Sequence, residues 1–211
     1  MRQNLLKGLV LNMTKKLFSK TLHSWLISND KKTIGSMLDV FDEKSFAFLF
    51  LVLMIFPAAP LPTGGLVHIF EVIVILIALQ LVIGRKELWL PKKLKKVELD
   101  SVTRKKVLPF LEKRVKFFER FAKPRLGGVM NNTWFRSQLG IFVILFTLGA
   151  FFAPPFTGLD TLPSLGVVFI AIGVILNDLA ILLVGYVVGA VGLTITFVLS
   201  ASIIAAIQAL F

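Results

Sequence analysis

The chain has 211 residues, of which 56% are hydrophobic, and it has no cysteine, which excludes disulfides, thiolate metal sites and cysteine nucleophiles. The apolar fraction exceeds the roughly 45–50% of soluble domains, and a soluble protein of this size could not cover so much apolar surface with polar groups. The formal net charge is +12, but Lys and Arg occur only in residues 1–44 and 85–136, unlike the interleaved pattern of a nucleic-acid-binding domain. We therefore predict an all-α integral membrane protein and no nucleic-acid partner.

Residues 1–44 form a basic amphipathic segment at the start of the chain. Within it, residues 1–28 have apolar side chains near helical spacing and lysines on the other faces, which predicts an amphipathic helix. Lysine together with tryptophan and leucine is typical of a helix that lies in a membrane interface. The lack of acidic residues before Asp30 also resembles a mitochondrial transit peptide, so the sequence leaves open whether this is a targeting segment.

The first apolar block, residues 45–84, predicts a membrane hairpin. Phe46 to Phe56 predicts a short helix of about 16 Å, half of a ~30 Å hydrocarbon core, and Leu66 to Ile83 predicts a helix long enough to span. The prolines and glycines of residues 57–65 interrupt them. The block is therefore either two crossings with a tight turn or one crossing preceded by a re-entrant half-helix.

Residues 85–136 form a second basic segment, with sixteen Lys and Arg against five acidic residues. The positive-inside bias places this segment and the N-terminus in the cytoplasm, in a multi-pass protein of the inner (plasma) membrane. Two short helices are predicted at 101–108 and 109–122. The second is basic and rich in Phe, with Leu111 and Val115 in its apolar stripe, which is suited to binding anionic lipid head groups.

The second apolar block, residues 137–211, predicts a further hairpin and C-terminal transmembrane helices. Helices are expected at Leu139 to Ala153 and Pro163 to Leu176. The run from Leu179 to Phe211 is too long for one span, so we expect two helices there, broken near Gly189–Gly192. Gly185 and Gly189 suit close helix packing, within one chain or between chains.

The two apolar blocks share the motif Pro-x-x-Thr-Gly, at residues 60–64 and 154–158, between a Phe-rich and a Val/Ile-rich helix. Such a duplication with interrupted helices points to a site near the membrane midplane. The alternative is that membrane hairpins all need turn residues and the match arose by chance.

Glu71 is the sharpest candidate for chemistry, because it is an acid inside an apolar helix with His68 one turn before it on the same face. An acid within a membrane suggests proton or cation passage, whereas an acid near the helix N-terminus can simply be interfacial. Asp160 and Asp178 each stand at a helix start, where Asp most often caps backbone N–H groups. The candidate intramembrane polar site comprises Glu71, His68, Pro60, Pro62, Thr63, Gly64, Asp160 and Asp178.

The sequence contains no serine nucleophile motif, phosphate-binding glycine loop or paired-carboxylate constellation, and only two histidines. We therefore expect no enzymatic activity, no metal and no cofactor.

Three stretches together resemble the ExoD family of bacterial exopolysaccharide-synthesis membrane proteins. They are Gln80-x-x-x-Gly84-Arg85-x-x-x-Trp89-Leu90-Pro91, Lys123-Pro124-Arg125-Leu126, and Pro154-Pro155-Phe156 with Leu162-Pro163-Ser164-Leu165. The chain departs from the family pattern at Asp160 and at residues 177–180. The resemblance implies an inner-membrane protein linked to exopolysaccharide production, without a defined reaction. From the residues themselves, we expect Arg85, Trp89, Pro91 and Arg125 to be membrane-interface anchors.

Two functions are compatible with this pattern. The first is a permease-like protein that moves an ion, a lipid or a lipid-linked sugar. The second is a non-transporting accessory or scaffold subunit of the polysaccharide-synthesis machinery. The expected partners are the lipid bilayer and its anionic head groups; other polysaccharide-synthesis proteins and a second copy of the chain are further candidates.

Overall fold

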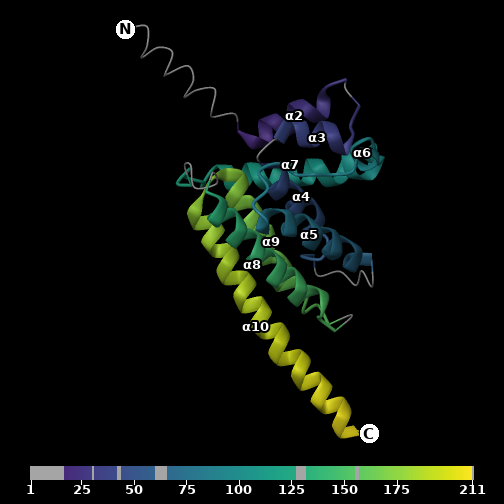
Figure 1. Cartoon of the computed structure of the whole chain (residues 1–211), viewed down its shortest axis with the longest axis vertical. Helices are drawn as coiled ribbons and strands as arrows, with labels where there is room; N and C mark the ends of the chain where they lie inside the picture. The colour runs from purple at the N-terminus through teal and green to yellow at the C-terminus, as the bar shows by residue number, and fades with distance from the viewer. Residues whose placement is uncertain are drawn as a thin grey trace. The chain divides into compact units, whose positions relative to one another are not determined.

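The computed structural model describes residues 17–29, 31–41, 44–59, 66–126, 132–154 and 157–210, with the side chains of Leu66 and of residues 203–210 excepted. These residues are mostly helical, which confirms the predicted all-α class for the described part of the chain (Figure 1). They divide into two compact units. Unit 1 contains the described residues of 1–40 and 92–121, and unit 2 contains those of 41–91 and 122–211. Of the amphipathic helix predicted at 1–28, residues 1–16 lie outside the described residues, as do residues 60–65 of the first proline-rich turn.

Unit 1 pairs helix α2 (Phe18–Ile27) with helix α7 (Leu108–Glu119). Each helix buries residues that recur every three or four positions: Phe18, Leu22 and Trp25 in α2, and Leu108, Leu111 and Val115 in α7. The π-helix η2 (Thr103–Val107) continues directly into α7, so the two helices predicted at 101–108 and 109–122 form one helical stretch. Pro109 is tolerated because it lies in the first turn of α7. Helices α3 (Ile34–Phe41) and α6 (Lys92–Lys95) complete the unit.

Unit 2 consists of apolar helices: α4 (Ser45–Met54), α5 (Leu66–Val82), α8 (Thr133–Phe151), α9 (Thr161–Leu176) and α10 (Leu179–Leu210). Two of them, α8 and the Leu179–Ser202 part of α10, are long and apolar enough to cross a membrane. Helices α4, α5 and α9 begin and end within about two residues of the predicted positions. Helix α8 begins six residues before the predicted Leu139, because the Asn132 side chain caps it by accepting a hydrogen bond from Trp134 N (2.9 Å).

The predicted break near Gly189–Gly192 is wrong, because α10 is one continuous helix of 32 residues. Its glycines serve close packing. A Cβ at Gly189 would lie 2.2 Å from the Phe146 ring of α8, and a Cβ at Gly192 would lie 2.6 Å from Pro163 N of α9. At about 48 Å, α10 exceeds the ~30 Å hydrocarbon thickness on which the predicted break rested. In Figure 1 its C-terminal part extends past the other helices of unit 2.

The contacts between neighbouring helices fix their directions. Helices α5 and α8 are antiparallel, because Ser137 near the start of α8 donates to Val82 O (2.9 Å), whereas Phe151 at its end packs on His68. Helices α4 and α9 are antiparallel too, since Lys44 Nζ donates to Ile175 O (2.7 Å) at the end of α9. Unit 2 therefore has two ends. At the tip end, helices α4 and α8 finish and helices α5 and α9 start; the opposite end is the base end.

Candidate functional site

The sharpest feature of unit 2 is a buried acid–histidine pair on α5. Nδ1 of His68 lies 2.7 Å from Oε2 of Glu71, at the i, i+3 spacing that brings side chains to one helix face. The Glu71 side chain is fully buried, whereas 34% of the His68 side chain is exposed. Among the described residues, Glu71 Oε1 has no hydrogen-bond partner. The predicted pair therefore forms, with one carboxylate oxygen left for a further interaction.

The tip end brings other groups to this pair. The Phe151 ring of α8 meets the His68 ring edge-on, with the centroids 5.0 Å apart. Asp160, just before α9, lies within electrostatic range of both His68 and Glu71. Its side chain makes no N-cap hydrogen bond of regular geometry to α9, although the N–H groups of Asp160 and Thr161 interact with its carboxyl group, so the predicted capping role is not confirmed. Pro60, Pro62, Thr63 and Gly64 lie outside the described residues, and their role in this site stays a prediction.

Two residues that sequence reasoning missed lie at the same level as Glu71. The α5–α8 contacts pair His68 with Phe151 and Gly140 with Ala78, a register that sets Glu71 opposite Thr147–Leu148. Thr147 lies on the α8 stripe that faces α5, four residues before Phe151.

Ser164 of α9 belongs to this level too. A Cβ at Gly166 would lie 2.4 Å from Gly189 Cα, and a Cβ at Gly189 would touch the Phe146 ring, so Gly166 lies near the level of Phe146. Because α9 runs antiparallel to α8, Ser164, two residues before Gly166, then lies near the level of Leu148, two residues after Phe146. Thr147 and Ser164 are both fully buried. Their hydroxyl oxygens, like Glu71 Oε1, have no hydrogen-bond partner among the described residues. We call Glu71, Thr147 and Ser164 the polar layer.

Asp178 is not part of this site, because it lies at the base end between α9 and α10. Its Oδ1 accepts hydrogen bonds from Ala180 N (2.7 Å) and Ile181 N (3.2 Å), so the predicted capping role is confirmed. Its Oδ2 accepts from Lys123 N. Burial raises the pKa of Asp178, but the backbone N–H groups of these three residues outweigh it and hold the pKa below its usual range.

The Lys123-Pro124-Arg125-Leu126 stretch is bound to the turn that Asp178 closes. The backbone N–H groups of Arg125 and Leu126 both donate to Asn177 O (2.8 and 2.9 Å). Asn177 has φ 54°, a left-handed conformation that Asn tolerates. The Arg125 side chain is exposed. This stretch and the turn therefore form one structural unit, a relation that the sequence spacing does not reveal.

The stretch after α5 is organised by Gln80. The Gln80 side chain accepts from Trp89 N (2.9 Å) and donates to Trp89 O (3.2 Å), and the Arg85 guanidinium lies 5.9 Å from the centroid of the Trp89 ring. Gly84 ends α5 with φ +81°, where Arg85 N donates to Gln80 O (3.0 Å), an arrangement that favours glycine. Arg85, Trp89 and Pro91 are exposed. These contacts are structural, and the predicted anchoring in a membrane interface stays a prediction.

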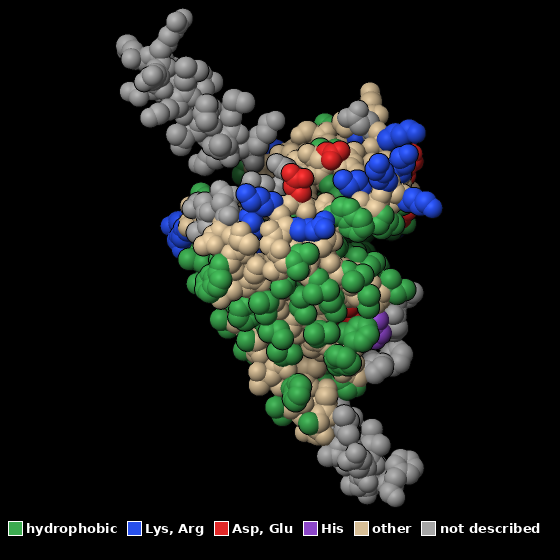
Figure 2. Space-filling view, viewed as in Figure 1, with side chains coloured by type: hydrophobic (Ala, Val, Ile, Leu, Met, Phe, Trp, Pro, Cys, Tyr) green, Lys and Arg blue, Asp and Glu red, His purple; other side chains and the backbone are tan. Residues whose placement is uncertain are grey.

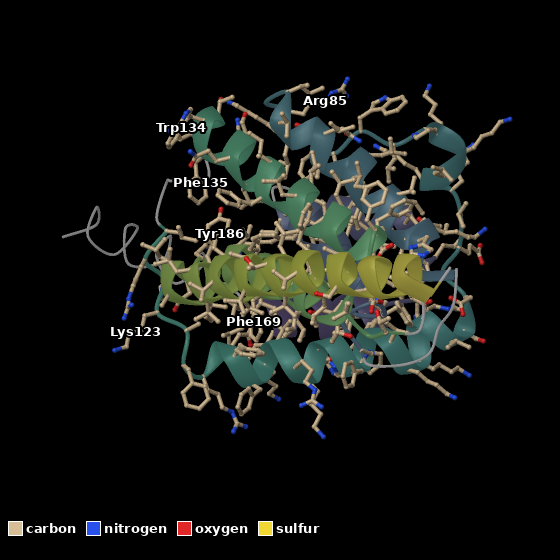
Figure 3. All side chains as sticks on the ribbon, turned by 90° about the horizontal axis from the view of Figure 1, so that it is seen from below. Arg85, Lys123, Trp134, Phe135, Phe169 and Tyr186 are labelled. Carbon is tan, nitrogen blue, oxygen red and sulfur yellow. The ribbon has the colours of Figure 1, made fainter. Side chains whose placement is uncertain are left out.

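The labelled side chains in Figure 3 show how these groups lie around unit 2. Arg85 and Trp134 lie toward the outside, and the Tyr186 side chain projects from α10. The Tyr186 ring packs on Phe142 of α8, with the centroids 4.6 Å apart. Around Tyr186 the base half is therefore packed by aromatic rings.

The residues of the site include groups that can exchange a proton. No group of three or more His, Asp or Glu side chains with metal-ligand geometry occurs among the described residues. A carboxylate hydrogen-bonded to an imidazole is instead a common means of holding and moving a proton.

Comparison with known proteins agrees with the resemblance seen in the sequence. The sequence model of the family described as "Exopolysaccharide synthesis, ExoD" matches residues 18–198. An uncharacterized protein of Synechocystis sp. (strain ATCC 27184 / PCC 6803 / Kazusa) is 28% identical over 171 residues, which is 76% of each chain. No solved structure matches the chain. The family match covers most of the chain, including the signature stretch from Gln80 to Pro91 and the Glu71–His68 pair. The chain therefore belongs to the ExoD family of exopolysaccharide-synthesis proteins.

Proposed function

We propose that this chain is a multi-pass inner-membrane protein that supports exopolysaccharide production by moving an ion, a lipid or a lipid-linked sugar through unit 2. Membership of the ExoD family supports the link to exopolysaccharide. The observation that carries the transport role is the buried Glu71–His68 pair within a group of apolar helices. Burying a carboxylate among apolar side chains costs several kcal/mol unless a partner or water compensates, so its presence suggests a function.

The surface of unit 2 supports insertion in a membrane. Figure 2 shows hydrophobic side chains over much of the visible face of unit 2. On α5 and at the residue after it, exposed apolar side chains recur at helical spacing, including Ile69 (59% exposed), Leu76 (58%) and Ile83 (70%). On α10, Val187 and Phe197 are among the exposed residues. An apolar surface this extensive on a folded unit is suited to contact with lipid.

The distribution of charge supports the proposed topology. Arg85, Lys123, Arg125 and Arg136 lie in the segments at the base end, and no Lys or Arg occurs in residues 45–84 or 137–211. The positive-inside bias then places the base end, residues 85–136 and the basic N-terminus in the cytoplasm. In this topology the tip end, with Glu71 and His68, faces the opposite side.

Contacts within unit 2 also support the proposed duplication. If α4 and α5 correspond to α8 and α9, the antiparallel pair α5–α8 is matched by the antiparallel pair α4–α9, and both pairs are in contact. Such an arrangement has an approximate two-fold axis along the helices. It is typical of duplicated membrane proteins, whose sites lie between the repeats.

The alternative proposal is a non-transporting accessory or scaffold subunit. The feature that favours it is the exposed face of α7 and of the turn after it in unit 1, where Phe110, Phe117 and Phe121 lie among basic residues such as Lys116 and Arg120. This face is suited to an anionic lipid surface or to another protein of the synthesis machinery.

The first test is genetic complementation of a strain in which the gene is deleted. Wild type and Glu87→Gln, an exposed acid after α5, should restore exopolysaccharide, because neither changes the site. Glu71→Gln keeps the shape of the side chain but removes its charge, so it should be expressed yet fail to restore exopolysaccharide. Full restoration by Glu71→Gln would remove the support for transport and favour the accessory role.

A further inference from the structure

Within the part of the chain that the structure describes, the polar layer contains three oxygens without a hydrogen bond. Three fully buried side chains, on α5, α8 and α9, each present an oxygen without a hydrogen-bond partner among the described residues. Leaving a buried polar group unpaired costs about 1–3 kcal/mol each, and more for a charged one. Three such groups at one level are therefore expected to have a common ligand or to bind one another in another protonation state.

The hydroxyl groups have the property that a proton site needs. A hydroxyl can donate a hydrogen bond to a carboxylate and, after rotation, accept one from a carboxylic acid. Hydroxyls that lie level with Glu71, as those of Thr147 and Ser164 do by register, therefore suit a group that gains and loses a proton. A backbone N–H group, by contrast, cannot accept the hydrogen bond that a carboxylic acid donates.

His68 supplies a route to this level. Its side chain is partly exposed at the tip end, while its Nδ1 contacts Glu71 Oε2, so the imidazole joins the surface to the buried carboxylate. A metal cation of the kind bound by oxygen takes about six ligands, whereas a proton needs only this hydrogen-bonded pair.

We propose that Glu71, with Thr147 and Ser164, is a proton-binding site that His68 loads from the tip end. A solvent proton binds the free ring nitrogen of His68, and the Nδ1 proton of the resulting imidazolium passes to Glu71 Oε2. Neutral imidazole and a neutral carboxylic acid remain, and the acid then exchanges hydrogen bonds with the two hydroxyls. This inference rests on the proposed function and names the proton as the ion.

Few charged groups surround this level. Among the described residues, His68 and Asp160 are the titratable groups in electrostatic range of Glu71. The described parts of α4, α9 and α10 carry no Lys, Arg, Asp or Glu, and the arginine of α8, Arg136, lies at the base end. A change in proton occupancy of Glu71 therefore changes the charge of the whole layer, with only His68 and Asp160 to offset it.

The proton site can be tested by infrared difference spectroscopy of the full chain in liposomes between alkaline and acidic pH. Wild type and Glu87→Gln should show the carbonyl band of a buried carboxylic acid at acidic pH, and Glu71→Gln should lose it. Thr147→Val and Ser164→Ala remove one hydroxyl each with little change of shape, so each should shift the frequency of the band. These two variants keep the test open even if Glu71→Gln does not fold.

A band that persists in folded Glu71→Gln, or that neither hydroxyl variant shifts, would overturn the proposal. So would a band that changes with Na⁺ concentration at constant pH, because that result assigns the site to a metal cation. Exopolysaccharide production by the same variants is a separate measurement. Loss of the band with unchanged exopolysaccharide would therefore uphold the proton site and reject the proposed function.

Discussion

The close contact between α9 and α10 predicts a large effect of one added methyl group. In Gly166→Ala, the new Cβ would lie 2.4 Å from Gly189 Cα and 2.6 Å from Gly189 N. Carbon atoms prefer separations of about 3.5–4.0 Å, so the two backbones would have to separate by about 1 Å. Overpacking of this kind costs about 1–3 kcal/mol, whereas the better helix propensity of Ala returns at most about 1 kcal/mol. The variant should therefore be destabilised by about 1–2 kcal/mol.

The matched control is Gly149→Ala on α8. Its Cβ would meet only the Cδ1 atom of Leu193 closely, at 2.3 Å, and the end of a leucine side chain can change rotamer. In thermal unfolding followed by tryptophan fluorescence, Gly166→Ala should lower Tm by about 2–8 °C, and Gly149→Ala should stay near wild type. If Gly166→Ala unfolds at or above the wild-type temperature, the glycine contact does not hold α9 against α10.

Three further predictions concern the base end and the basic segments. Asp178→Asn should destabilise the protein by about 2 kcal/mol near neutral pH, because it weakens charge-assisted hydrogen bonds from three N–H groups. Since the pKa of Asp178 is lowered in the folded protein, the difference in stability from wild type should shrink as the pH falls below about 4. Urea unfolding of both proteins across this pH range measures the difference. Cysteines at Lys20 and Lys95 should react with impermeant thiol reagents only from the cytoplasmic side, and labelling of either in intact cells would reject the topology. A peptide covering residues 98–126 should bind anionic liposomes with about 1 kcal/mol per well-placed Lys or Arg and lose binding with salt, whereas equal binding to neutral vesicles at high salt would reject the electrostatic term.

The helices were largely predictable because long apolar runs and proline clusters leave few alternatives. The ends of α9 and α4 follow from Asn177 and the proline after Phe56, which stop a helix for local reasons. The start of α8 was harder, since its first turn is polar and the cap at Asn132 is visible only when Trp134 N is seen to bind it.

Glycine explains the largest error in the prediction of the fold. Near Gly189–Gly192 the sequence alone allows a break or a close contact, and the choice depends on what lies across from the glycines. Phe146 and Pro163 occupy that space, and both come from segments distant in the sequence. Local pattern therefore could not decide between the two interpretations.

The residues of the candidate site also differ in how far the sequence alone predicts them. The Glu71–His68 pair was predictable, because it depends only on helical spacing within α5. Thr147 and Ser164 were not, since single hydroxyl residues in apolar helices are common and often bond to their own backbone. Only the register of α5, α8 and α9 sets them at one level with Glu71.

The glycine contact and the polar layer also depend on each other. Gly166 lies two residues after Ser164, so the contact that brings α9 against α10 fixes the position of Ser164 as well. At this level α10 contributes the glycine backbone and no charged side chain, and Thr147 of α8 lies level with Ser164 by register. A shift of α9 by about 1 Å in Gly166→Ala should therefore alter the infrared band of Glu71 as well as lower the stability. If the band is unchanged in a destabilised Gly166→Ala protein, Ser164 does not bind the Glu71 carboxyl group, and the layer must be completed from α5 and α8 alone.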